Sequence, residues 1–179
     1  MAGNEMQLIL IVEDNDDDYL ATMRAFKKAN LANPVRRCTN GDQALDYLLQ
    51  RGEFSAPDAA PRPNLILLDL NLPGTDGREV LHAIKADQGL QKIPVVVLTT
   101  SNAEQDIEQC YAAGANSYVQ KPVDFEGFIQ SVARLTDYWF NISILPKNFI
   151  RETVDGTASH STSLSKGDSQ LAGYVRAPE

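Results

Sequence analysis

The chain has 179 residues, 43% hydrophobic and 22% charged, which fits one ordinary globular domain. Its 16 Lys and Arg against 24 Asp and Glu give a net charge of −8, which argues against a nucleic-acid partner because phosphate backbones require clustered cations. Two separated cysteines, Cys38 and Cys110, exclude a disulfide scaffold, and the lack of a long apolar run or a signal-peptide pattern predicts a cytoplasmic protein with no membrane partner.

Short apolar runs alternate with amphipathic stretches along the chain. The runs predict parallel strands, buried on both faces, over residues 8–12, 35–38, 64–69, 94–98 and 118–121. Apolar residues at helical spacing predict a helix from the acidic run EDNDDD to about residue 30, and two more over 41–50 and 78–86. A fourth helix is expected to follow a cap at residues 99–102, and a fifth to follow a cap at Asp124. Phe125 is expected on the inner side of the last helix. Five strands alternating with five helices predict an α/β fold with a doubly wound parallel sheet.

Three segments are predicted: a domain over residues 6–138, an apolar arm over 139–151 and a polar, flexible tail over 152–179. In the arm, Asn141 and Ser143 alternate with isoleucines, which favours an extended conformation that reaches a second subunit. The alternative is that the apolar residues fold back over their own subunit.

Acidic and polar residues follow the predicted strands. Glu13 and Asp14 come after the first strand, Asp69 ends the third, Thr99 follows the fourth and Lys121 ends the fifth. In open α/β sheets, ligands bind outside the carboxyl ends of the strands, so these side chains are expected in one pocket. A single acidic residue after a strand is usually a turn former or a helix cap, but here every relevant strand ends in a residue that one mechanism requires.

The predicted pocket holds three carboxylates with an ammonium at its other edge. Two like charges ~4 Å apart repel by about 4 kcal/mol at an effective dielectric near 20, so such a cluster favours a bound cation. All-oxygen ligands with an open side suit Mg²⁺ and a phosphoryl group, and a carboxylate oxygen is available for attack.

These residues and their spacing resemble the response-regulator receiver domain of two-component signalling, over about residues 6–138. Asp69 lies 30 residues before Thr99 and 52 before Lys121 (99 − 69 and 121 − 69), as expected of the family. The run LILLDLNLPGTDGREVL, the proline-rich segment before it and the apolar extension are similar to the single-domain regulators associated with bacterial and cyanobacterial phytochromes.

The resemblance implies the flavodoxin-like strand order 2-1-3-4-5 and a role for each site residue. Asp69 would be the phosphoacceptor and would receive its phosphoryl group from the phosphohistidine of a kinase. Asp14, Asp69 and the main-chain carbonyl of Asn71 would bind Mg²⁺, with Glu13 acting chiefly through a metal-bound water.

Two further roles follow from the same resemblance. Thr99 would be the switch hydroxyl and Lys121 its ion-pairing partner, with Pro122 after a cis bond. Tyr118 occupies the place of the aromatic switch residue, although it fits a packed strand aromatic equally well.

The function implied is a phosphoacceptor that switches partner binding, not an enzyme with independent turnover. Its expected partners are a phytochrome-type histidine kinase and a second copy of the chain, through the fourth helix, fifth strand, fifth helix and arm. Alternatives are a phosphorelay intermediate and an aspartate-nucleophile phosphatase, which would need a second carboxylate where Asn71 stands. A flavodoxin-like cofactor binder is disfavoured because EDNDDD would repel a flavin phosphate.

Overall fold

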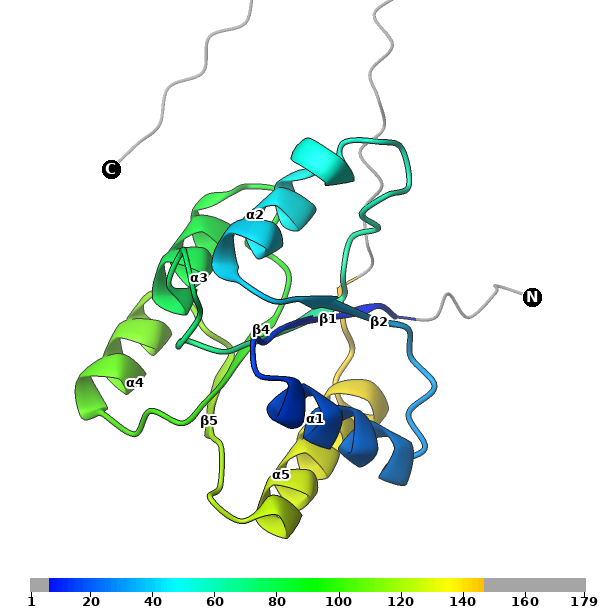
Figure 1. The fold of residues 1–179 in the computed structure, drawn as a ribbon, viewed down its shortest axis with the longest axis vertical. Coiled ribbons are helices and arrows are strands. Elements are labelled where there is room, and N and C mark those ends of the chain that lie inside the picture. The colour runs from blue at the N-terminus through cyan, green and yellow to red at the C-terminus, as the bar shows by residue number, and fades with distance from the viewer. Residues whose placement is uncertain (1–6, 147–179) are drawn as a thin grey trace, which may run out of the picture. The chain divides into compact units, whose positions relative to one another are not determined.

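The computed structural model describes residues 7–146, which form a parallel sheet with helices on both faces (Figure 1). The strands are β1 (Ile9–Val12), β2 (Val35–Cys38), β3 (Leu65–Leu68), β4 (Val95–Thr99) and β5 (Ser117–Gln120). Their order is β2-β1-β3-β4-β5, which confirms the predicted doubly wound topology. The central strands β1, β3 and β4 are buried along their whole length, as their continuous apolar sequences require.

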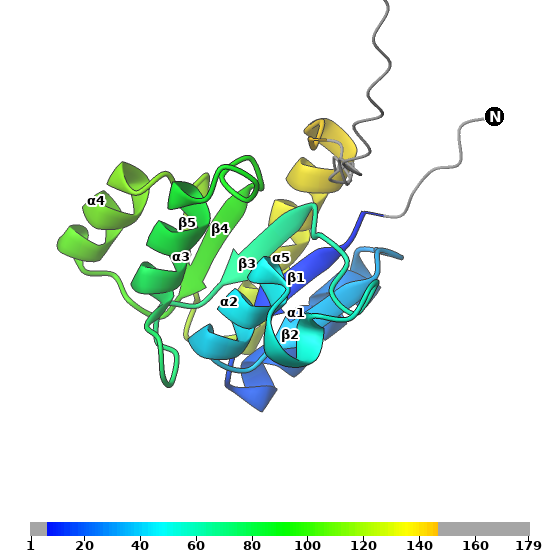
Figure 2. The same ribbon diagram turned by 90° about the horizontal axis from the view of Figure 1, so that it is seen from above.

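Two helical layers cover the sheet (Figure 1, Figure 2). On one face lie α1 (Asp16–Lys28) and α5 (Phe125–Asp137), which pack against each other. On the other lie α2 (Gly41–Leu49), α3 (Gly77–Ala86) and α4 (Glu104–Ala112). A 3₁₀ turn, η1 (Gly52–Phe54), follows α2 in the proline-rich segment. Among residues 7–146, no helix has the length and apolar character of a membrane span.

The register of the sheet brings the strand ends together. Val12 pairs with Leu68, and Leu68 pairs with Val97, so the residues after β1, β3 and β4 leave the sheet at one edge. At the start of α3, Gly77 lies against this edge, where a Cβ atom would come within 2.1 Å of the Asp69 carbonyl oxygen. A side chain at Gly77 would therefore displace the strand end that carries Asp69.

Helix caps agree with the sequence at most positions and differ at one. The Asn15 carboxamide accepts hydrogen bonds from the backbone N–H groups of Asp17 and Asp18, and Asp124 caps α5 as predicted. The predicted cap of α4 by residues 99–102 is wrong, because the N-cap is Ala103 and has no side-chain bond. Thr99 instead completes β4.

The chain beyond α5 departs from an extended arm. A π-helical turn, η2 (Tyr138–Ile142), continues α5 directly, and Trp139 and Leu145 are buried in the core beneath α1 and α5. The extended conformation predicted for the arm is therefore wrong for residues 139–142, because the helical continuation of α5 places the apolar Trp139 in the core and away from water. Ile142 and Ile144 remain 67% and 96% exposed. The rest of the predicted arm from residue 147 and the tail over 152–179 lie outside the described residues.

Candidate functional site

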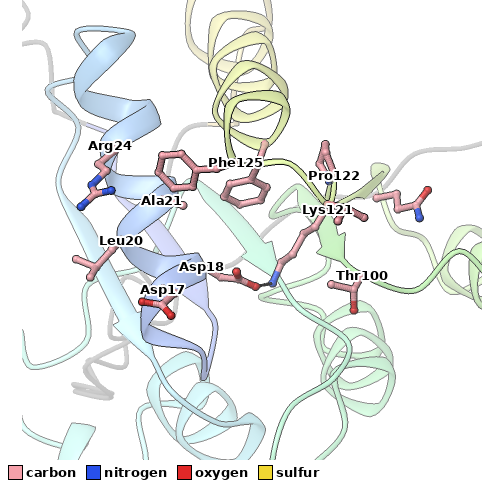
Figure 3. Close-up of a pocket in the computed structure, with 12 residues that line it drawn as sticks. Asp17, Asp18, Leu20, Ala21, Arg24, Thr100, Lys121, Pro122 and Phe125 are labelled. Atoms are coloured by element: carbon pink, nitrogen blue, oxygen red, sulfur yellow. Dashed lines mark hydrogen bonds and ion pairs between the residues drawn. The ribbon is translucent and has the colours of Figure 1, made fainter.

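Lys121 stands at the centre of a buried ion-pair cluster. It follows β5, and its Nζ lies 2.6 Å from Oε2 of Glu13, 2.7 Å from Oδ2 of Asp69 and 2.8 Å from Oδ2 of Asp18. Figure 3 shows the contact with Asp18, which crosses from β5 to the first turn of α1. One ammonium thus joins the end of β5 to the ends of β1 and β3 and to the first turn of α1.

A second grouping of carboxylates lies beside this ammonium. Oxygen atoms of Glu13, Asp14 and Asp69 all lie within 4.8 Å of one another, with Glu13 and Asp69 buried and Asp14 exposed. At such distances like charges repel by several kcal/mol unless a proton or a cation intervenes. The donors are all oxygens and one side is open to solvent, so the set fits a hard divalent cation.

The electrostatics follow from one cation among several anions. Burial raises the pKa of Glu13 to about 7, against the lowering effect of Lys121. Burial lowers the pKa of Lys121, but the charges of Asp69 and Glu13 and the hydrogen bonds of the cluster outweigh it, so this pKa lies above its ordinary value. The raised pKa of Lys121 favours its charged ammonium form, and the raised pKa of Glu13 favours a proton on that carboxyl up to about neutral pH.

Asp69 is held by the backbone on both sides. Its N–H donates to the Val12 carbonyl at 3.0 Å, and its Oδ1 accepts from the N–H of Asn71 at 3.1 Å. One carboxylate oxygen thus faces Lys121 and the other faces the loop after β3. The Asn71 side chain reaches the hydroxyls of Thr99 at 3.4 Å and Thr100 at 3.3 Å.

Thr99 is buried, and its hydroxyl makes only long hydrogen bonds. Besides Asn71, the N–H of Ser101 approaches Thr99 Oγ1 at 3.5 Å. These contacts lie at or beyond the usual length, so the hydroxyl can reorient at little cost. Tyr118 is half-buried against the α2–α3–α4 layer, and its hydroxyl donates to the Ser101 carbonyl at 3.0 Å. Both proposed switch residues therefore meet the loop after β4.

One residue of the ion-pair cluster is not predicted from the sequence, and two predicted details differ in the structure. Asp18 had been assigned only to the start of a helix, yet its carboxylate binds Lys121. It lies one turn before the buried Ala21 and Thr22, so helical periodicity contained the signal. The cis bond expected before Pro122 is wrong, because residues 7–146 contain no cis peptide. Phe125 is 46% exposed instead of facing inward.

A groove of about 550 Å³ opens beside Lys121, between α1 and the start of α5 (Figure 3). Leu20 and Val123 line it as exposed apolar side chains, and the Arg24 guanidinium lies 5.6 Å above the Phe125 ring. Lys121 thus lines a surface groove that is partly apolar, although its side chain is only 3% exposed.

Comparison with known proteins shows which family has this arrangement of strands and strand-end residues. A model of the response regulator receiver domain matches residues 9–133. The chain belongs to this family. The match covers all five strands and the acidic, hydroxyl and lysine positions at their ends.

Relatives with the same domain are similar over most of their length. The probable methanogenesis regulatory protein FilR2 of Methanothrix harundinacea is 41% identical over 133 residues, 74% of this chain and 83% of that protein. Response regulator Rcp1 of Synechocystis sp. is 38% identical over 144 residues, 80% of this chain and 96% of Rcp1.

Solved structures give the same result. The phosphorylated cyanobacterial phytochrome response regulator RcpA has a TM-score of 0.74 and 40% identity, covering 79% of this chain and 99% of RcpA. The Mn²⁺-bound form of Rcp1 has a TM-score of 0.75 and 38% identity, with the same coverage. The fold and family of this response regulator are thereby established.

Proposed function

We propose that this response regulator accepts a phosphoryl group on Asp69 from the phosphohistidine of a histidine kinase. The observation that carries the proposal is the position of Asp69, which is buried, belongs to the acidic cluster with Glu13 and Asp14, and has one carboxylate oxygen 2.7 Å from the Lys121 ammonium. In the transfer, a carboxylate oxygen of Asp69 forms a bond to phosphorus while the P–N bond to histidine breaks. The electron pair of the broken P–N bond remains on the imidazole nitrogen, which then takes up a proton.

The acidic cluster would hold Mg²⁺ during this step. Asp14 and Asp69, with the main-chain carbonyl of Asn71, would supply protein ligands, and Glu13 would act through a bound water. Mg²⁺ prefers such oxygen donors and commonly keeps several waters and a substrate phosphate. When bound, it supplies positive charge where the carboxylates and the phosphoryl oxygens would otherwise repel each other. Lys121 supplies further positive charge from the opposite side.

Phosphorylation would be read out through Thr99 and Tyr118. The weakly bonded Thr99 hydroxyl is free to turn toward a phosphoryl oxygen, which would pull on the loop after β4. Because the Tyr118 hydroxyl is bonded to Ser101 in that loop, its packing would change with it. The product of the reaction is thus a changed surface for a partner, and we propose no independent turnover.

A phytochrome-type histidine kinase is the proposed donor. RcpA is a cyanobacterial phytochrome response regulator, and the 40% identical RtBRR is a bacteriophytochrome response regulator. The partly apolar groove lined by Lys121, the residue that contacts the Asp69 carboxylate, gives a protein donor a surface near the acceptor. A phosphatase is disfavoured because Asn71 stands where that class needs a second carboxylate.

A homodimer is the proposed assembly. Its face would comprise α4, β5 and α5 together with the chain that follows α5. Tyr138, Ile142 and Ile144 are exposed apolar side chains at this end of the domain, and covering them would remove an apolar patch from water.

Phosphorylation with acetyl phosphate, followed by intact mass measurement, tests the function. We expect one added phosphate on the wild-type chain in the presence of Mg²⁺ and none on Asp69→Asn. Because the carboxylates must be neutralised before an anion approaches, excess chelator should also abolish labelling. Full labelling of Asp69→Asn, or of wild type in chelator, would refute the assignment.

A further inference from the structure

Arg37 joins β2 to the loop that carries two of the clustered carboxylates. Its Nε donates to the Glu13 carbonyl at 2.9 Å, one terminal nitrogen donates to the Asp14 carbonyl at 3.0 Å, and the other donates to Oδ1 of Asp16 at 2.7 Å. All three nitrogens of the guanidinium therefore donate to this short stretch, at Glu13, Asp14 and Asp16.

The guanidinium is itself held in place. It stacks on the Tyr19 ring with 4.5 Å between the guanidinium carbon and the ring centroid, and the Arg37 side chain is only 18% exposed. Next to it, the backbone carbonyl of Cys38 accepts the N–H of Glu13 at 3.0 Å. The Glu13 peptide is thus tied to β2 through both the backbone and a side chain.

The loop needs this support because secondary structure does not fix it. Residues 13–15 lie between the end of β1 and the start of α1 and belong to neither element. Fixing the carbonyls of Glu13 and Asp14 fixes the backbone dihedrals of both residues, and so the direction in which each carboxylate leaves the chain. Partners that orient metal ligands in this way commonly change metal affinity by about 10–100-fold when removed.

We propose that Arg37 is a positioning residue for the metal site, holding the carboxylates of Glu13 and Asp14 toward Asp69. The inference deepens the proposed function, since it rests on a divalent cation binding at that cluster. Arginine suits the task because its planar fork donates to several acceptors at once, which a lysine ammonium at the same place does not reproduce.

A purely electrostatic role for Arg37 would predict the opposite effect on Mg²⁺ affinity. If the guanidinium acted only by its charge, it would repel a cation, and its removal would tighten Mg²⁺ binding. Positioning predicts weaker binding instead. The two roles therefore differ in the sign of the effect.

The experiment compares Mg²⁺ affinity by isothermal titration calorimetry for wild type, Arg37→Gln and Arg37→Lys. Both variants should bind Mg²⁺ about tenfold more weakly. Amide hydrogen exchange without metal should be faster at residues 13–16 in both. Arg36→Gln is the matched control, because it removes the same charge from the neighbouring exposed position, whose side chain points to the other face of the sheet. Its affinity should remain near that of wild type.

Each outcome decides the proposal. Tighter or unchanged binding in Arg37→Gln, or wild-type affinity in Arg37→Lys, would overturn it. If Arg37→Gln does not fold, Tyr19→Leu removes the stacking surface without altering charge and should weaken Mg²⁺ binding in the same direction; an unchanged affinity there overturns the proposal as well. Failure of the wild-type chain to bind Mg²⁺ would instead refute the metal site in the proposed function.

Discussion

At the scale of single residues, the site is governed by one ammonium shared among three carboxylates. Lys121 contacts Glu13, Asp18 and Asp69 at 2.6–2.8 Å, and Glu13 and Asp69 are buried. A single positive charge does not compensate three negative ones. Burial raises the pKa of Glu13 to about 7, and the negative charge of Asp69 adds a smaller contribution in the same direction.

The stability of the metal-free protein should therefore fall as pH rises toward neutrality. Between its ordinary pKa of 4.5 and the raised value of about 7, Glu13 holds a proton in the folded state that the unfolded chain has released. Raising the pH through this window favours unfolding, and from about pH 5.5 to about pH 7.5 the loss should be about 2 kcal/mol. Urea denaturation in the presence of chelator measures it.

Glu13→Gln is the control for this effect. The variant carries no titrating group at position 13, so its free energy of unfolding should vary less with pH over the same range. The lowered pKa of Asp106 places the titration of that group below the window. The same pH slope in wild type and Glu13→Gln would show that another group is responsible.

Lys121 and Thr99 should separate phosphoryl transfer from switching. Lys121→Ala removes a charge next to Asp69 in a buried site, so labelling by acetyl phosphate should slow roughly 100-fold. Thr99→Ala removes a hydroxyl that only long hydrogen bonds hold, so it should accept phosphate at nearly the wild-type rate. It should, however, show a smaller change in hydrogen exchange around β5 after phosphorylation. Loss of labelling in Thr99→Ala would contradict this division of roles.

At the scale of elements, a polar chain joins α3, α4 and β5. Arg78 on α3 makes a two-pronged ion pair with Asp106 on α4, at 2.8 Å and 2.6 Å. Asp106 in turn accepts the Ser101 hydroxyl at 2.5 Å, and the Ser101 carbonyl accepts the Tyr118 hydroxyl. Because α4 has no side-chain cap, these bonds fix its first turn and the loop that follows Thr99.

Asp106→Asn should loosen α4 without unfolding the domain. The ion pair is two-pronged but partly exposed, with Arg78 at 29% and Asp106 at 17%, so we expect a loss of about 1 kcal/mol in unfolding free energy. Amide exchange should quicken in α4 and in the loop before it. Glu108→Gln removes the same charge from an exposed position on α4 and is the matched control. Equal effects of the two substitutions would exclude the specific pairing.

At the scale of the whole molecule, the two ends of α5 carry different exposed apolar groups. Leu20 and Val123 line the groove near the start of α5, whereas Tyr138, Ile142 and Ile144 follow its end. Trp139 and Leu145, in the same segment, are buried, so truncation after Tyr138 would remove part of the core along with the patch. Substitution of exposed residues is the cleaner way to test assembly.

The double variant Ile142→Ser and Ile144→Ser should be monomeric. By sedimentation equilibrium at tens of micromolar, we expect the full-length wild type to be dimeric without phosphate and this variant to lose the dimer, because it removes apolar surface that association would cover. Its melting temperature, measured at low concentration, should stay near that of wild type since both side chains are exposed. Leu20→Ser, an exposed apolar substitution in the groove, should remain dimeric. A monomeric wild type, or a dimer in the double variant, would refute the proposal.

Much of this protein could be read from its sequence, because strand burial and strand ends leave strong local signals. Continuous runs such as Leu65–Leu68 fit only a sheet buried on both faces, which predicted the core and the α/β class. The same regularity placed Asp69, Thr99 and Lys121 at the ends of their strands, and parallel strands bring such ends to one edge. Resemblance to the receiver family supplied the strand order and the proposed roles.

Tertiary structure decided which neighbouring groups pair with these residues. The run Asp16–Asp18 contains three identical side chains, and only packing of α1 against α5 turns Asp18 toward Lys121. Arg37 had no local signal, since its partners lie more than twenty positions away in the sequence. The helical turn at residues 138–142 is not predicted for a related reason. The alternation of polar residues with isoleucines favours an extended arm, but burial of Trp139 and Leu145 in the core outweighs this local propensity. Contacts between distant elements set these features: helical spacing places Asp18 on the buried side of α1, but only the tertiary structure shows that Lys121 is its partner.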